Sequence, residues 1–228
     1  MQDNLESVKI FRQKYREEKI SKHYYGWLHF TLTTILSIAI ISISFFRLRD
    51  VQSLEWLTIP LTFLYANIAE YFGHIGPMHH LRKPFGLMYQ RHTKEHHVFF
   101  TDKYMEFDSS KDFKAVLFPI VLVLFFFGLI GIPSWLLLYW LFSSNVAWLF
   151  SMTAVAYFLN YEWLHFAYHC SEESWLRYIP GFRKLRQLHL HHHNQKLMSR
   201  YNFNITYPIG DILFGTYYKA STKPTNQL

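Results

Sequence analysis

The stretch YYGWLHFTLTTILSIAIISISF, residues 24 to 45, contains no Asp, Glu, Lys or Arg. It is slightly longer than the roughly 20 apolar residues that a helix needs to span a bilayer. Half of the 228 residues are hydrophobic and 22 residues are Phe, which indicates more apolar surface than a soluble core needs. We therefore predict an integral membrane protein whose first spanning helix is this stretch.

Three further apolar stretches are long enough to span a bilayer, and they cover residues 53 to 73, 115 to 132 and 135 to 159. The first of them carries Glu55 and Glu70 near its ends. The other two are joined only by Pro133 and Ser134, which predicts a tight turn. The predicted fold class is an all-α membrane protein with four transmembrane helices in two hairpins. A charged arm, residues 1–23, precedes a single membrane domain, residues 24–228.

The Lys and Arg residues are distributed unevenly around these spans. Of the 23, all but two lie in the N-terminal arm, in the long loop that starts at His74 and in the tail after His169. Because cytoplasmic segments carry the excess of Lys and Arg, the arm, the long loop and the tail are predicted to be cytoplasmic. The net charge of +7 then indicates contact with anionic membrane lipids, with no need to invoke nucleic acid. Which membrane the protein occupies stays open.

Ten of the 14 histidines fall into four groups, each at the cytoplasmic end of a predicted span or in a cytoplasmic segment after one. The groups are HIGPMH (74–79), HTKEHH (92–97), HFAYH (165–169) and HLHHH (189–193). Groups that are distant in the sequence thus converge on one membrane face, where we expect a helical cap.

The spacing within the groups suits metal ligands. An i, i+4 pair such as His165 and His169 places two imidazoles on one face of a helix, close enough to share a metal or to hold adjacent metals. Adjacent histidines such as His96 and His97 diverge by about 100° on a helix, so each can serve a different ion. Ten imidazoles exceed the needs of one ion, and imidazole suits iron, copper and zinc. The cap is therefore predicted to carry a histidine-rich site for two metals.

Not every histidine fits this pattern. On a helix, His189, His192 and His193 lie on one face, whereas His191 points about 200° away from His189. We expect His191 to face solvent or headgroups, and His80 also falls outside the pattern.

Two glutamates precede predicted ligands on the same helix faces. Glu70 lies four residues before His74, and Glu162 lies three residues before His165. Each is placed to accept the second N–H of an imidazole, although carboxylates at membrane ends also have structural roles.

Several other metal and redox classes are excluded. The single cysteine, Cys170, leaves no intrachain disulfide, four-cysteine iron–sulfur cluster or cysteine zinc ribbon. The HExxH motif of zinc peptidases is absent. Carboxylate-bridged di-iron proteins need two ExxH motifs and further glutamates, whereas this chain has one such motif, Glu162 with His165.

The four groups, in this order and with these separations, resemble the histidine boxes of the fatty acid hydroxylase superfamily, which includes sterol desaturases, fatty acid 2-hydroxylases and carotenoid hydroxylases. The tail segment NFNITYPIGDILFGTYY (202–218) strengthens the resemblance, because an Asp, here Asp211, followed shortly by Phe-Gly-Thr closes the catalytic domain in that family. The resemblance covers about residues 55 to 218.

This resemblance implies a membrane-bound non-haem di-iron oxygenase that uses O2 to hydroxylate, or to desaturate, an unactivated C–H position of a lipid such as a fatty acyl chain. Two iron ions are the implied cofactor, and zinc can occupy such sites once iron is lost. Asp211, with Glu70 and Glu162, would support the ligands from behind. The implied ligands are His74, His79, His92, His96, His97, His165, His169, His189, His192 and His193.

The electrons would come from a separate donor of the cytochrome b5, ferredoxin or reductase type. No cytochrome b5 segment fits before Tyr24, and no GxGxxG dinucleotide motif is present. The alternative is a membrane metal transporter or a metal-binding protein without oxidative catalysis. Transport sites tend to lie near the bilayer midplane on broken helices, whereas these histidines cluster at the ends of the spans.

The distribution of Lys and Arg predicts that residue 1 and residue 228 face the same side of the membrane. Reporter fusions at the two ends should both report the cytoplasm, since four spans return the chain to its starting side. Reporters that fall on opposite sides would refute an even number of spans.

Overall fold

The computed structural model describes residues 5–218, and within them the chain forms helices and loops, with a single bridge between Thr101 and Tyr104 in place of any strand. The α-helices are α1 (Leu5–Lys19), α2 (Gly26–Phe46), α3 (Thr58–Gly73), α4 (Gly86–Tyr89), α5 (His97–Phe99), α6 (Ile120–Phe126), α7 (Ile132–Leu141), α8 (Ser144–Tyr168), α9 (Phe182–His192) and α10 (Ile209–Leu213). Turns of 3-10 helix are η1 (Glu55–Leu57), η3 (Lys83–Phe85), η5 (Ser110–Ala115) and η7 (Trp175–Tyr178). Turns of π-helix are η2 (His74–Met78), η4 (Gln90–His96) and η6 (Phe127–Gly131).

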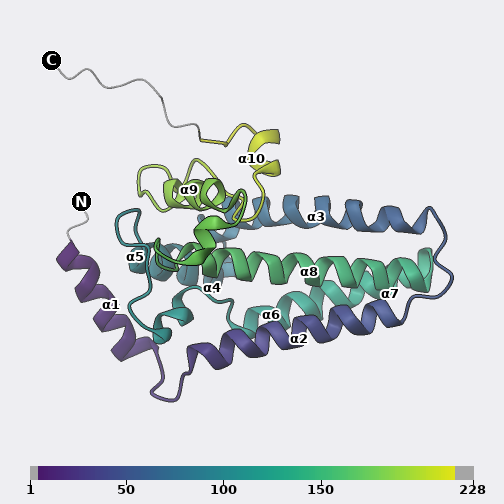
Figure 1. Ribbon diagram of the computed structural model, residues 1–228, viewed down its shortest axis with the longest axis horizontal. Coiled ribbons are helices and arrows are strands. Elements are labelled where there is room, and N and C mark those ends of the chain that lie inside the picture. The colour runs from purple at the N-terminus through teal and green to yellow at the C-terminus, as the bar shows by residue number, and fades with distance from the viewer. Residues whose placement is uncertain (1–4, 219–228) are drawn as a thin grey trace.

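The long helices run lengthwise as a bundle with α8 at its centre (Figure 1). α8 packs against α2, α3 and α7. Within the described residues, two segments are long and apolar enough to cross a membrane, namely α2 and the run Ser110–Leu141. Side chains on their outer faces are exposed, such as Leu36 at 62% and Leu124 at 68%, as expected for helices that face hydrocarbon. Spanning by α3 and α8, and the arrangement in two hairpins, stay predictions.

The turn predicted at Pro133 and Ser134 is wrong. α6, η6 and α7 follow one another without a loop from Ile120 to Leu141, and the chain turns at Phe142 and Ser143 instead. Pro133 is tolerated because it occupies the first turn of α7, just after the π-helical turn, where the missing N–H of proline costs little. The Ser143 hydroxyl begins α8 by accepting the backbone N–H of Val146 at 3.1 Å.

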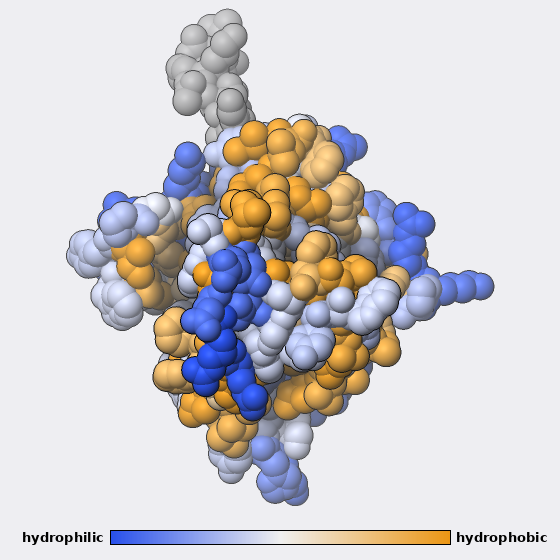
Figure 2. Space-filling view, turned by 90° about the vertical axis from the view of Figure 1, so that its right-hand side faces the viewer, coloured by the Kyte–Doolittle hydropathy of each residue, from blue (hydrophilic) through white to orange (hydrophobic). Residues whose placement is uncertain are grey.

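At the end of the bundle around that turn, hydrophilic residues form a strip among apolar ones on the surface (Figure 2). Glu55 accepts hydrogen bonds from the Ser143 hydroxyl and from Asn145 Nδ2, the latter at 3.0 Å. The side-chain oxygen of Asn145 accepts the backbone N–H of Arg49 at 3.0 Å. These contacts tie the α2–α3 connection to the α7–α8 turn, so Glu55 has a structural role.

The opposite end of the bundle carries a cap built from α4, α5, α9, α10 and their connecting loops (Figure 1). α1 packs against this cap at α5. The first and the last described helices, α1 and α10, both lie on the cap side (Figure 1). The remaining parts of the predicted arm and tail, residues 1–4 and 219–228, lie outside the described residues. The four histidine-containing segments, residues 74–79, 92–97, 165–169 and 189–193, also come together at the cap.

Candidate metal centre

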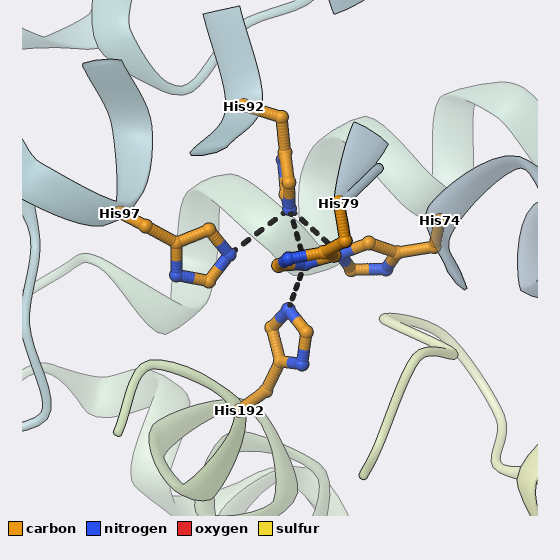
Figure 3. Close-up of side chains that lie close together, drawn as sticks. All are labelled: His74, His79, His92, His97 and His192. Atoms are coloured by element: carbon orange, nitrogen blue, oxygen red, sulfur yellow. Dashed lines mark hydrogen bonds between the residues drawn. The ribbon is translucent and has the colours of Figure 1, made fainter. Parts of the chain in front are cut away.

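The ten predicted ligands are all buried in the cap, and the structure divides them into two groups of five. Within each group, one ring nitrogen from every imidazole lies within 4.8 Å of the others. The first group (Figure 3) is His74, His79, His92, His97 and His192. The second group is His96, His165, His169, His189 and His193.

Neighbouring histidines divide between the two groups as the sequence predicted. His96 belongs to the second group and His97 to the first, and the same split separates His193 from His192. A helix directs two consecutive side chains about 100° apart, so one short segment supplies both groups. The two groups therefore share α9 and the η4–α5 segment.

Two pairs in the first group depend on π-helical winding. His74 and His79, and likewise His92 and His97, are five residues apart. On an α-helix this spacing would leave the two side chains about 140° apart, whereas a π-helix closes its turn between i and i+5 and brings them to one side. The pairs begin in η2 and η4, both of them π-helical. The repeated five-residue spacing of these pairs is the sequence signal for this geometry.

The protonation of the rings leaves metal-binding lone pairs at the centre of each group. Nδ1 of His96 donates to the Ala115 carbonyl at 2.9 Å, and Nδ1 of His193 donates to the Phe100 carbonyl at 2.8 Å. Each neutral ring then has an unprotonated Nε2, and these two Nε2 atoms face each other at 3.1 Å. Two lone pairs cannot form a hydrogen bond, so this contact is favourable only when a cation, such as a metal ion, binds both nitrogens.

The spacing of the nitrogens fits such a cation. Two ligands that lie about 2.1 Å from one ion and at right angles to each other are about 3.0 Å apart. In the first group, Nε2 of His92 lies 3.0 Å from that of His97 and 3.2 Å from that of His79. In the second group, Nε2 of His189 lies 3.2 Å from that of His169. The donor atoms of both groups therefore fit a metal ion.

The electrostatics of the cap keep these rings neutral. Burial, reinforced by neighbouring imidazoles, lowers the pKa of His79 to about 2. Burial also lowers the pKa of His192 to about 4, against the hydrogen bond to the Tyr201 carbonyl, which raises it. Neutral imidazole is the form that binds metal, so no proton has to be displaced near neutral pH.

Asp211 holds the loop that orients two ligands of the first group. Nδ1 of His192 donates to the Tyr201 carbonyl at 3.0 Å, and Nδ1 of His74 donates to the Phe203 carbonyl. The buried carboxylate of Asp211 accepts the backbone N–H groups of Phe203 and Asn204, both at 2.8 Å. Asp211 thus fixes the loop whose carbonyls accept the two imidazole N–H groups, without contacting a ring itself.

The two glutamates do not make the imidazole contacts that their spacing predicted. Glu70 accepts the backbone N–H groups of Ile205 and Thr206, because the N–H of the His74 ring is already taken by a backbone carbonyl. Glu162 accepts the backbone N–H of Phe118 at 3.1 Å. Both carboxylates therefore fix backbone segments near the site.

The two histidines outside the predicted pattern lie outside both groups. His80 is exposed, and its Nδ1 donates to the Ile75 carbonyl at 2.7 Å. His191 is partly buried, with its Nε2 3.0 Å from the side-chain nitrogen of Gln187. The helical phase of α9 separates His191 from its three neighbours as predicted.

Comparison with known proteins agrees with this geometry. The model of the fatty acid hydroxylase family matches residues 59–216, which is more than half of the chain. The chain belongs to the fatty acid hydroxylase family. A solved structure described as full-length scs7p, with only the hydroxylase domain visible, shares the fold with a TM-score of 0.60 and 17% sequence identity. That similarity covers 86% of this chain and 67% of the other. No curated protein matches the chain.

Two cavities adjoin the candidate metal centre. The smaller, of about 40 Å³, is lined by His92 of the first group and by His96 and His165 of the second. The larger, of about 300 Å³, lies between α3, α6 and α8 and is lined by His74 and by apolar side chains as far as Ile130. Four side chains line both cavities, namely Met78, Met88, Phe118 and Tyr161. The apolar cavity between the membrane helices therefore lies directly beside the small cavity that both groups border.

The division of α9 between the two groups predicts different results for three consecutive histidines, His191, His192 and His193. His192→Ala and His193→Ala should each abolish turnover and lower metal content from two ions toward one, because a buried ligand has no substitute nearby. His191→Ala, the matched control, should keep most activity and both metals. Metal analysis and product yield for the three variants check this. An intact His192→Ala enzyme would end the ligand assignment of this helix.

Proposed function

We propose that this fatty acid hydroxylase is a membrane-bound non-haem di-iron oxygenase that hydroxylates an unactivated C–H position of a lipid, such as a fatty acyl chain, with O2 and external electrons. The observation that carries the proposal is the pair of adjacent five-imidazole groups, which border one small cavity beside an apolar cavity between the helices. A metal centre next to an apolar channel suits oxidation of a hydrocarbon.

The donor set supports a resident redox metal. Imidazole nitrogens suit iron, and two bound iron ions would supply the activation of O2 that attack on an unactivated C–H bond requires. Five of the ten imidazoles, His74, His96, His169, His192 and His193, donate Nδ1–H to a backbone carbonyl. Rings held in this way suit a permanently bound metal better than one in transit, so we favour the enzyme over the transporter. Zinc is expected to bind the same nitrogens once iron is lost.

The chain itself would bind the lipid and exclude water. The larger cavity is lined by Ala69 of α3, Phe126 of α6 and Ala154 of α8, together with other apolar side chains. Such walls recognise an acyl chain by area rather than by hydrogen bonds. Phe118 and Tyr161 stand where the two cavities adjoin and would set the target carbon against both groups. The same arrangement would serve desaturation, so the product decides between the two reactions.

The cap offers a surface for the remaining partners. Exposed basic side chains on α9 and the following loop include Arg183, Lys184, Lys196 and Arg200. We propose that this cytoplasmic face receives electrons from a separate donor of the cytochrome b5, ferredoxin or reductase type and also contacts anionic lipids. Electrons that enter along α9 would travel a short way, since the opposite face of the helix carries His189 and His192.

Iron content and lipid products test the proposal together. Protein purified without O2 should contain about two iron ions per chain, because ten imidazoles converge on two groups. Cells that gain the chain should accumulate a lipid heavier by one oxygen, detected by mass spectrometry, and the His192→Ala variant should not produce it. One metal or none per chain, or a wild-type lipid profile identical to that of the variant, would contradict the proposal.

Filling the larger cavity should block the substrate without removing the metals. Ala154 lines the cavity, so Ala154→Phe places a ring in the path of the lipid and should lower product yield at least about tenfold while both metals remain. Ala39→Phe, on the exposed face of α2, makes the same change away from the cavity and should have little effect. Equal product yields from the two variants would show that the lipid does not use this cavity.

A further inference from the structure

α1 lies outside the residues matched by the family model, yet it packs next to the metal centre. Its Tyr15 is buried in one hydrophobic cluster with Phe99, Phe100 and Met105. These three residues belong to the segment that follows η4, which itself supplies ligands to both groups. α1 is therefore positioned to influence the site from outside the family core.

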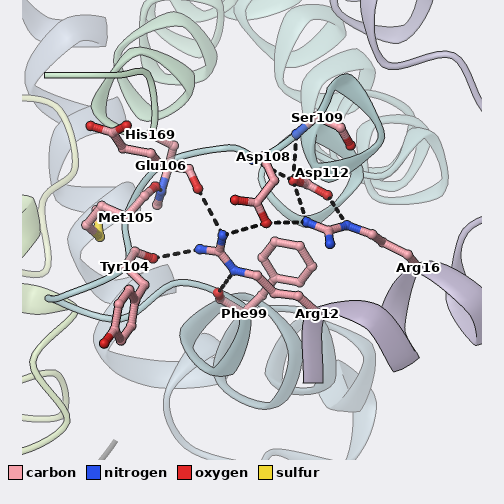
Figure 4. A network of polar contacts seen from close by, with 10 residues as sticks. All are labelled: Arg12, Arg16, Phe99, Tyr104, Met105, Glu106, Asp108, Ser109, Asp112 and His169. Carbon is pink, nitrogen blue, oxygen red and sulfur yellow. Dashed lines mark hydrogen bonds and ion pairs between the residues drawn. The ribbon is translucent and has the colours of Figure 1, made fainter. Parts of the chain in front are cut away.

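Arg12 is the main polar contact of α1 with this segment (Figure 4). The side chain is buried, with 5% of its surface exposed. Its guanidinium donates to three backbone carbonyls, those of Phe99 at 2.8 Å, Tyr104 at 2.7 Å and Glu106 at 3.1 Å. The same group lies 5.1 Å from the centre of the Phe100 ring. One planar donor thus fixes both ends of the loop between Phe99 and Glu106.

The same loop supplies the acceptors for two ligands of the second group. The Phe100 carbonyl accepts Nδ1–H of His193, and the Met105 carbonyl accepts Nδ1–H of His169, both at 2.8 Å. Each of these carbonyls is adjacent in the sequence to a carbonyl that Arg12 holds. Because the peptide units are rigid planes, a shift at Phe99 or Tyr104 would move the acceptors of both imidazoles.

A second arginine of α1 supports a third ligand of the same group. Arg16 pairs with the buried carboxylate of Asp112, with Nε 2.8 Å from Oδ1. Asp112 in turn forms the capping box that begins η5, the turn whose last carbonyl, that of Ala115, accepts Nδ1–H of His96. Three of the five imidazoles in the second group therefore rest on segments that α1 holds.

We propose that Arg12 is a positioning residue for the metal of the second group, acting through the backbone carbonyls of Phe100 and Met105 on His193 and His169. The first group has a different support, because two of its imidazoles donate to carbonyls of the loop of residues 201–206. Asp211 and Glu70 hold this tail loop. The inference rests on the proposed two-metal centre and predicts that the two metals respond separately to changes in α1.

The test measures metal affinity in two backgrounds, each with one group disabled. His74→Ala with His79→Ala leaves the second group, and His165→Ala with His169→Ala leaves the first. The full chain in detergent is titrated with Co²⁺ in the absence of O2. Arg12→Met should weaken Co²⁺ binding about 10–100-fold where the second group remains, the usual effect of losing support behind a ligand. Where the first group remains, the affinity should change by less than about threefold.

Two further variants keep the test decisive. Arg12→Lys keeps the charge, but one ammonium cannot reproduce the fork over three carbonyls, so it should give an intermediate loss and also serves if Arg12→Met does not fold. Lys14→Met, on the same helix with its side chain 67% exposed, should change neither affinity.

Each remaining outcome bears on the inference. Equal losses in both backgrounds would assign Arg12 a general role in stability, and no loss in either would remove its positioning role. A wild-type chain that binds no Co²⁺ would overturn the two-metal centre and this inference with it. By contrast, a chain that binds two metals but yields no oxidised lipid would contradict the proposed oxygenase while leaving the role of Arg12 intact.

Discussion

Unprotonated imidazole nitrogens that face one another about 3 Å apart repel unless a cation binds both, and this repulsion is the constraint on which the architecture of the cap depends. His96 and His193 show it most clearly, because each ring donates its Nδ1–H to a backbone carbonyl and the unprotonated Nε2 atoms of the two rings face each other. Burial away from water then keeps the imidazoles neutral, which preserves the lone pairs. The helices of the cap, its carbonyl acceptors and its apolar surroundings all serve this arrangement.

The two groups share helices but have separate supports. α9 contributes ligands to both groups, as does the η4–α5 segment. The backbone segments that accept the imidazole N–H groups differ between the two groups. The tail loop, held by Asp211 and Glu70, orients His74 and His192 of the first group. Segments held by α1 orient ligands of the second group. Shared ligand helices would fix the distance between two bound metals, and separate supports would allow each environment to be tuned alone.

Much of this centre could be predicted from the sequence, because its signals are local. Consecutive pairs such as His96 and His97 must diverge on any helix, which placed them in different groups, and the phase of α9 separated His191 from its neighbours. Features that depend on the local winding of the chain were missed. Pro133 indicated a turn but is accommodated behind a π-helical turn, and the shared group of His92 and His97 depends on π-helical winding that periodicity alone does not reveal. The acceptors behind the rings were also invisible, because any residue has a carbonyl and only the tertiary fold selects which one an imidazole meets.

The cost of building the centre explains why metal and fold are expected to depend on each other. Four ligands, two in each group, bury an Nδ1 that has no hydrogen-bond partner among the described residues: His79, His97, His165 and His189. Each such group costs about 1–3 kcal/mol, so the cap without metal is destabilised at the same place where it presents its lone pairs. Metal binding by imidazole and thiolate sites contributes on the order of 10 kcal/mol per ion, more than enough to offset that cost. Metal bound by the two groups would therefore stabilise the cap at the place where its buried imidazoles are least well satisfied.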